Sequence, residues 1–141
     1  MARTRSVSAE TSCCTPESLP MARPPLAARP LLGFFDAVQV MALFKVLSND
    51  TRIRILHHII RSGEATVTDI ARSLEMKPQA ISNQLMRLSD TRMLASRRDG
   101  NNVYYRLENC CVAPLLDLAL CLMESGTKPL NDQGIIHVEP D

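Results

Sequence analysis

The chain of 141 residues has no tryptophan, only two tyrosines and three phenylalanines, and no long hydrophobic run. Its apolar stretches fall far short of the roughly 18 residues that a membrane-spanning helix needs. Near the start, no continuous apolar stretch with a small-residue cleavage site follows the basic residues, so no secretory leader is predicted. We therefore expect a cytoplasmic protein that does not enter a membrane and whose thiols stay reduced.

The sequence also lacks the arrangements that catalysis most often uses. No nucleophile is paired with a base, no glycine-rich loop is spaced to hold a phosphate, and no pair of carboxylates has a recognisable spacing. These absences disfavour an enzyme and favour a binding protein.

Charge is unevenly distributed although the formal net charge is only +1. Residues 44–108 contain eleven lysines and arginines against seven acids, whereas residues 109–141 contain one lysine against five acids. A basic middle segment is compatible with nucleic-acid binding, but a solvated surface of mixed charge has the same composition.

Four of the five cysteines form two adjacent pairs, Cys13-Cys14 and Cys110-Cys111, and the fifth is Cys121. Paired thiols indicate either soft-ion binding or redox chemistry. A structural role remains open, because cysteine is also a small residue that is often buried.

The apolar pattern divides the chain into a central domain and two tails. Residues 1–30 hold five prolines among Ser, Thr and Arg and are expected to be a disordered tail. Residues 31–125 are predicted to form the ordered domain, and 126–141 a flexible acidic tail. Met21 could be the true start, in which case Cys13-Cys14 would be absent.

Within the ordered domain, helical spacing and cap residues predict five helices and a hairpin. The first helix covers about 31–47, and the second helix follows Ser48-Asn49-Asp50 and ends at Gly63. Thr66 or Thr68 caps the third helix, and Pro78 occupies the first position of the fourth. Strands are predicted at 93–97 and 103–107 around an Asp-Gly turn, and a last helix at about 111–124. This order is that of a mainly α winged helix-turn-helix domain with a small β-hairpin.

The fourth helix has the composition of a DNA recognition helix. Ile81, Leu85 and Leu88 form one apolar stripe, and the predicted base-reading residues are Gln79, Ser82, Asn83 and Gln84. The predicted phosphate contacts are Lys77, Arg87, Arg97 and Arg98. Winged helices also serve as protein-interaction modules, so the pattern alone leaves that alternative open.

Three segments, 43–56, 79–85 and 97–105, resemble in order the helix opening, recognition helix and wing of the ArsR/SmtB repressors. The resemblance covers about Val40 to Met123. It implies a homodimer formed by the first and last helices, which would explain why both are too apolar for a single buried stripe. It also implies that the domain binds double-stranded operator DNA, with Asn101 and Asn102 of the wing taking part, and releases it when an effector binds. Activation instead of repression remains open.

Departures from the family pattern direct attention to the last helix. Arsenic-sensing members carry Cys-x-Cys where this chain has Thr66-Val67-Thr68, and the positions of the zinc ligands of zinc-sensing members hold Asn109, Cys111, Leu122 and Ser125. Thiols stand in this region instead, at Cys110, Cys111 and Cys121, and a helix N-terminus at the pair would favour thiolate.

The three thiols of one chain cannot meet, because eleven residues of helix separate Cys110 from Cys121 by roughly 16 Å. Antiparallel pairing of two last helices would instead bring Cys121 of the partner subunit to Cys110-Cys111. The predicted effector is As(III), Sb(III) or an organoarsenical, followed by Hg(II), Cd(II) or Pb(II). Cys13 and Cys14 are further candidate ligands. The alternatives are a regulator that senses oxidants or sulfane sulfur through its thiols, and structural cysteines.

Overall fold

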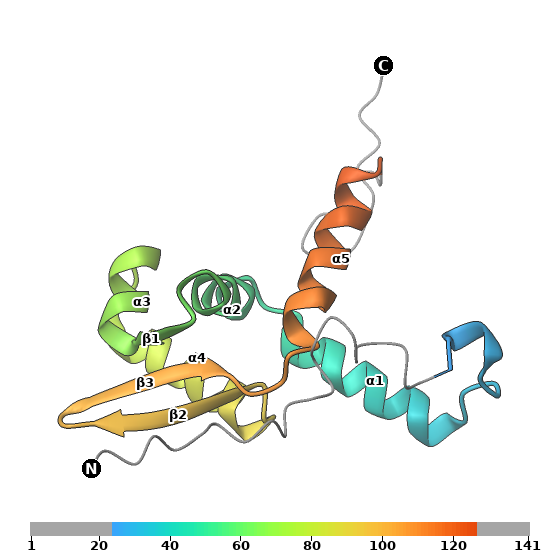
Figure 1. Ribbon diagram of the computed structural model, residues 1–141, viewed down its shortest axis with the longest axis horizontal. Helices are drawn as coiled ribbons and strands as arrows, with labels where there is room; N and C mark the ends of the chain where they lie inside the picture. The colour runs from blue at the N-terminus through green and yellow to red at the C-terminus, as the bar shows by residue number, and fades with distance from the viewer. Residues whose placement is uncertain (1–23, 127–141) are drawn as a thin grey trace, which may run out of the picture. The chain divides into compact units, whose positions relative to one another are not determined.

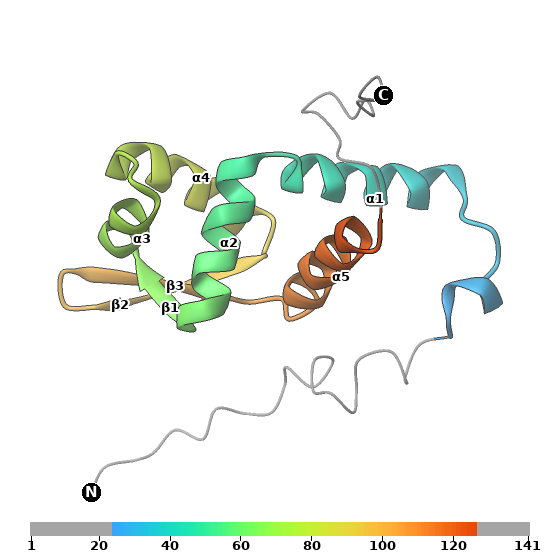
Figure 2. The same ribbon diagram turned by 90° about the horizontal axis from the view of Figure 1, so that it is seen from above.

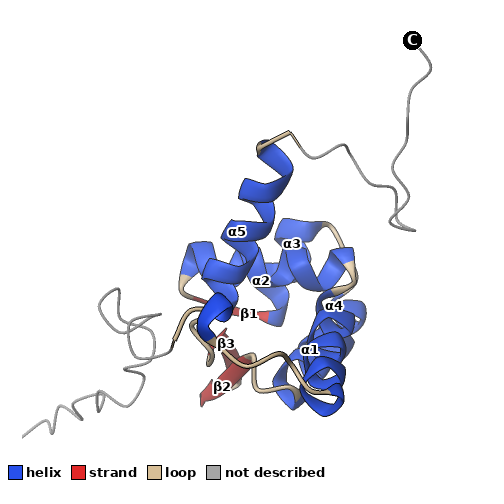
Figure 3. Cartoon of the chain, turned by 90° about the vertical axis from the view of Figure 1, so that its right-hand side faces the viewer, coloured by secondary structure: helices blue, strands red, loops and turns tan. Residues whose placement is uncertain are grey.

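The computed structural model describes residues 24–126 of the chain. In order, its elements are the 3-10 helix η2 (Leu26–Ala28), α1 (Phe34–Leu47), α2 (Asp50–Ser62), β1 (Glu64–Thr66), α3 (Val67–Leu74), α4 (Pro78–Asp90), β2 (Leu94–Asp99), β3 (Asn102–Leu107) and α5 (Val112–Glu124) (Figure 3). The predicted mainly α winged helix-turn-helix fold with its hairpin is confirmed. Strand β1 was not predicted, and η2 lies inside the segment predicted to be a tail.

Local cap chemistry sets where the central helices begin and end. The Asn49 side chain accepts a hydrogen bond of 3.0 Å from the Arg52 N–H at the start of α2, and Gly63 ends this helix with φ +81°. Pro78 occupies the first turn of α4, where the missing N–H costs nothing. These three boundaries agree with the sequence prediction.

A reciprocal cap begins α3. The Thr66 hydroxyl accepts from the Asp69 N–H, and the Asp69 carboxylate accepts from the Thr66 N–H, both at 3.2 Å. The hydrogen bond from the Thr66 N–H to the carboxylate is the largest cause of a lowered pKa of Asp69, because it stabilises the ionised form. The cap fixes the angle at which β1 leads into the helix-turn-helix pair α3–α4.

The three strands form one antiparallel sheet in the order β1-β3-β2. The β2–β3 register runs from Leu94 opposite Leu107 to Asp99 opposite Asn102, so only Gly100 and Asn101 lie between the strands. Gly100 has φ +60°, a value that glycine adopts at little cost. The strands are longer and the turn tighter than predicted, and the hairpin tip projects beyond α3 and α4 (Figures 1 and 2).

Helices α2, α3 and α4 and strand β2 supply an apolar core. Eight large side chains in it are less than 2% exposed: Ile55, Leu56, Ile59, Ile70, Ile81, Leu85, Leu88 and Leu94. No polar or charged residue of the described part is classed as buried. Apolar burial on this scale holds α4 against α2 and the sheet.

Helices α1 and α5 are far less covered. Helix α1 leads away from the α2–α3–α4 group (Figure 2), and Phe34 is 89% exposed. Residues up to Cys110 pack as one compact unit, and α5 belongs to a second unit that begins at Cys111. On α5, Leu118 and Leu122 are 66% and 65% exposed. Among residues 24–126, none of the helices has the length and apolar character that a membrane crossing needs.

Candidate nucleic-acid interface and cysteine site

Helix α4 separates its apolar and polar faces as predicted. Ile81, Leu85 and Leu88 are fully buried, whereas Gln79 and Asn83 are exposed. The Gln79 Nε2 donates a hydrogen bond of 3.1 Å to the Asn83 Oδ1. This bond leaves the Asn83 amide N–H groups as outward donors and the Gln79 carbonyl as an outward acceptor. Adenine presents the matching acceptor and donor, N7 and N6, in the major groove.

The other predicted residues of this helix are not equally placed. Lys77 is the exposed N-cap of α4, and Arg87 is exposed in its last turn. Ser82 is half-buried. Gln84 is also half-buried, and its Oε1 atom is buried without a hydrogen-bond partner in the described residues. Gln84 is therefore directed less toward solvent than Gln79 and Asn83.

Arg97 and Arg98 of the wing have different surroundings, although the sequence analysis predicted both as phosphate contacts. Arg97 and Arg98 are consecutive on β2, so their side chains leave opposite faces of the sheet. Arg97 donates from Nε and Nη2 to the two carboxylate oxygens of Glu64 at 2.9 and 2.6 Å, and its guanidinium lies 4.4 Å from the centre of the Tyr104 ring. Arg98 is exposed and forms no ion pair within the described residues.

The Arg97–Glu64 pair links the two outer strands of the sheet across β3. Its hydrogen bonds lower the pKa of Glu64 and raise the pKa of Arg97, because each charge stabilises the other. Sequence reasoning missed Glu64, since 33 residues separate it from Arg97 and no local pattern reports such a pair. Arg97 therefore stabilises the wing, whereas the side chain of Arg98 remains available to bind a ligand.

The wing tip presents the two predicted amides. Asn101 is in the two-residue turn and Asn102 begins β3, and both are exposed. The exposed cationic and amide groups of the wing and of α4 are the ones that positioning on a phosphate backbone requires.

The cysteines lie where β3 gives way to α5. Cys110 is half-buried and disulfide-bonded, and Cys111 is the exposed N-cap of α5. Cys121 is an exposed, free cysteine near the end of α5, with its sulfur 3.9 Å from the Ser125 hydroxyl. The prediction that the pair lies at the N-terminus of the last helix is confirmed, although the helix begins at Val112 and not at Cys111. The disulfide at Cys110 departs from the expectation that the thiols stay reduced. Cys13 and Cys14 lie outside the described residues.

A single copy of the described chain does not assemble a metal site. Among residues 24–126, no group of three or more His, Cys, Asp or Glu side chains is placed to hold one ion. Ten residues separate Cys111 from Cys121, about 15 Å along the helix axis, which one ion cannot bridge. Any site that uses both positions therefore requires a second chain.

Comparison with known proteins places these elements in context. A model of the MarR family matches residues 49–102, which run from the α2 cap to the start of β3. The chain is similar to the cadmium resistance transcriptional regulatory protein CadC of Listeria innocua, with 31% identity over 97 residues, 69% of this chain and 82% of the relative.

Two solved structures resemble the fold closely. The crystal structure of AntR, an antimony-specific transcriptional repressor, is 51% identical, with a TM-score of 0.65 over 73% of this chain and 93% of that one. The solution structure of apo-NmtR is 30% identical, with a TM-score of 0.62 over 78% of this chain and 92% of that one. A regulator of the same name from Mycobacterium tuberculosis is 34% identical over 97 residues, 69% of this chain and 80% of the relative.

Proposed function

The chain belongs to the ArsR/SmtB family of metal-responsive transcriptional regulators, and we propose that it is a homodimeric repressor that leaves its operator when As(III) or Sb(III) binds cysteine thiolates. The observation that carries the proposal is the cysteine pair directly before α5, together with Cys121 on the same helix. The similarity to an antimony-specific repressor over 93% of that chain supports the choice of a trivalent metalloid. Hg(II), Cd(II) and Pb(II) form the second class of effector.

Binding to DNA rests on α4 and the wing. Gln79 and Asn83 read base edges, helped by Ser82 and, from its half-buried position, Gln84. Sequence-independent contacts to phosphates come from Lys77, Arg87, Arg98, Asn101 and Asn102, with Arg97 holding the wing in place and contributing charge.

Dimer formation supplies what the single chain lacks. The apolar side chains exposed on α1 and α5 exceed what a monomer would leave in water, and the most exposed of them is Phe34 on α1. Pairing two copies through these helices buries that surface. If the two α5 helices run antiparallel, Cys121 of the partner subunit approaches Cys110 and Cys111, giving three thiolates for one metalloid. Thiolates select such soft ions over Mg or Ca.

The position of the cysteine pair supports a coupling between effector binding and DNA binding. Only residues 108–111 connect β3 of the wing to the first helical residue of α5, and the boundary between the two compact units falls between Cys110 and Cys111. An ion that holds both sulfurs restrains this connection. The DNA-bound and DNA-free forms then differ in affinity for the effector, which is the requirement for release.

A gel shift with DNA from upstream of the protein's own gene tests the proposal. Arsenite and antimonite are added to the reduced wild type and to Cys110→Ser/Cys111→Ser, with Zn(II), Cd(II), Hg(II) and Pb(II) as further arms. We expect the wild type to release DNA and the double variant to bind DNA with unchanged affinity but to stay bound at effector concentrations at least tenfold higher. Release of the double variant at wild-type concentrations would exclude the assigned pair.

Mixed dimers test the contribution of the second chain. Cys121→Ser and Cys110→Ser/Cys111→Ser are prepared separately and then combined, so that a mixed dimer keeps one complete three-thiolate site. We expect effector binding to be weak in each parent and to return in about half of the sites of mixed dimers. If Cys121→Ser alone responds as the wild type does, Cys121 is not a ligand.

A thiol-redox regulator is the second candidate function, and the disulfide at Cys110 is the observation that favours it. In that case peroxide or polysulfide releases DNA without any metalloid, and a reductant restores binding. Mass spectrometry of the released protein after removal of any metalloid distinguishes the two functions, because only the redox route leaves oxidised or sulfur-bearing cysteines.

A further inference from the structure

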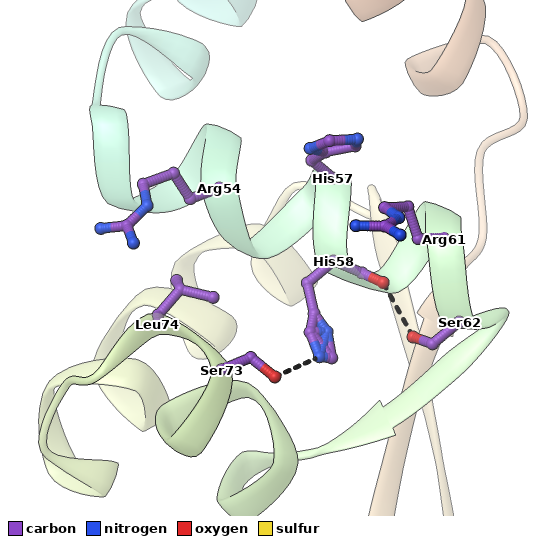
Figure 4. A pocket seen from close by; sticks show the side chains of 7 residues that line it. All are labelled: Arg54, His57, His58, Arg61, Ser62, Ser73 and Leu74. Carbon is purple, nitrogen blue, oxygen red and sulfur yellow. Dashed lines mark hydrogen bonds between the residues drawn. The ribbon is translucent and has the colours of Figure 1, made fainter.

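A cationic pocket of about 470 Å³ lies on α2 and α3, away from the recognition helix and the wing. Helix α2 contributes Arg54, His57, His58 and Arg61, which follow one another at i, i+3, i+4 and i+7 and so form one stripe. Helix α3 contributes Ser73 and Leu74 (Figure 4). None of the lining residues is an acid, and none comes from α4, β2 or β3.

The two arginines of this pocket are not neutralised by other residues of the described segment 24–126. Neither Arg54 nor Arg61 forms an ion pair with another of the described residues. Asp69 interacts electrostatically with His58, but its carboxylate already accepts a hydrogen bond from the Thr66 N–H at the cap of α3. A surface that keeps two guanidinium groups uncompensated in one concavity attracts anions.

His58 has hydrogen-bonding capacity that the protein uses only in part. It reaches from α2 toward α3, where its Nε2 lies 3.2 Å from the Ser73 hydroxyl, whereas His57 points away from α3 (Figure 4). The Nδ1 atom of His58 is buried and has no hydrogen-bond partner in the described residues. The Ser73 contact places the imidazole at the wall between the two helices, with the arginines on either side of it along α2.

We propose that this pocket binds a linear polyphosphate group, either as inorganic polyphosphate or as the phosphate chain of a nucleotide. Seven residues separate the two arginines, about 10.5 Å along α2, so their charges are spread over a length that suits several linked phosphates better than one. Guanidinium groups pair with phosphate oxygens through two parallel N–H bonds. Leu74 is the one hydrophobic residue among those that line the pocket, so recognition rests on charge and not on a nucleobase. This site is independent of the metalloid response.

Calorimetry on the reduced full-length protein with tripolyphosphate, ATP and adenosine, all without Mg²⁺, tests the site. We expect tripolyphosphate to bind at least as tightly as ATP and adenosine not to bind. Binding of adenosine, or of ATP alone, would overturn recognition through the phosphate chain.

Charge-matched variants separate the pocket from a general effect of positive charge. Arg61→Gln should weaken tripolyphosphate binding at least tenfold, whereas Arg92→Gln, which removes an exposed arginine outside the pocket, should change it less than twofold. Equal losses in the two variants would show that only net charge matters. Circular dichroism checks folding, and NMR of the wild type gives a second readout, since tripolyphosphate should shift the His58 ring signals more than those of any residue on α4.

Operator binding distinguishes the pocket from the DNA surface. Arg54→Gln/Arg61→Gln should bind operator DNA within twofold of the wild type at the same salt concentration, since these residues lie on neither α4 nor the wing. A tenfold loss of operator affinity would instead assign the stripe to the DNA backbone contact and overturn the proposal.

Discussion

Replacing Gln79 by alanine tests whether α4 reads bases through the Gln79–Asn83 pair. The substitution removes an i, i+4 amide contact of 3.1 Å on the exposed face of the helix, which is worth only about 0.2–0.5 kcal/mol to folding. A bidentate amide contact to adenine contributes about 1–3 kcal/mol of discrimination. We therefore expect operator affinity to fall about 5- to 150-fold while stability hardly changes.

Fluorescence anisotropy at one fixed salt concentration measures this effect against a series of operators with single base-pair changes. At the base pair that Gln79 reads, the variant should lose its preference, so that the wild-type and altered operators bind it equally. Met86→Ala is the matched control for an exposed change on the same helix, since its side chain is 62% exposed and lies about two turns further on. An equal loss on all sequences, including non-specific DNA, would refute base reading by Gln79.

Three further predictions concern the wing and the helix cap. Arg98→Ala should weaken binding to all DNA sequences alike and reduce the slope of log affinity against log salt by about 1, as measured by anisotropy at several salt concentrations. Glu64→Gln should release Arg97 and make the salt slope steeper. The ion pair lowers the pKa of Glu64, so its contribution to stability is present above the ordinary pKa of 4.5 and is lost as pH falls through the lowered pKa. The unfolding of the variant should therefore depend less on pH in acid. Thr66→Ala removes half of the α3 cap and should cost about 0.5–2 kcal/mol in urea unfolding, with base preference unchanged. An unchanged salt slope in both wing variants would argue against wing contacts to phosphate, and a wild-type unfolding midpoint in Thr66→Ala would show that the cap contributes nothing.

The features that could be predicted from sequence are those whose causes lie within a few residues. Asn49 and Thr66 accept hydrogen bonds from backbone N–H groups of the next turn, and Pro78 suits a first helical turn, so residue types located the helix starts to within a few residues. The sequence left the choice between Thr66 and Thr68 open, and the structure assigns the cap to Thr66. The buried stripe of α4 followed in the same way from its spacing. Strand β1 was missed because three residues carry little pattern, and its partner in the sheet, β3, begins 36 residues after β1 ends.

In the candidate sites, too, local features could be predicted from sequence and contacts between distant residues could not. That Gln79 and Asn83 are exposed followed from helical spacing, whereas their mutual hydrogen bond and the commitment of Arg97 to Glu64 needed coordinates. The pocket on α2 also escaped the sequence reasoning, because its stripe of Arg and His resembles an ordinary solvated face until α3 closes one side of it.

The proposed cysteine site could not be assembled from the sequence or from a single folded chain. Cys111 and Cys121 are fixed about 15 Å apart by the helix that carries them, so a shared ion must draw on another copy. The exposed leucines of the same helix favour association with another chain for a separate reason, because leaving apolar surface in water costs free energy. One association would meet both requirements. In the proposed mechanism, an effector that bound the DNA-bound and DNA-free forms equally would release nothing, so metalloid binding must favour the DNA-free form by about the 1–3 kcal/mol that is typical of allosteric coupling. We propose that this restraint acts at residues 108–111, which connect β3 to α5.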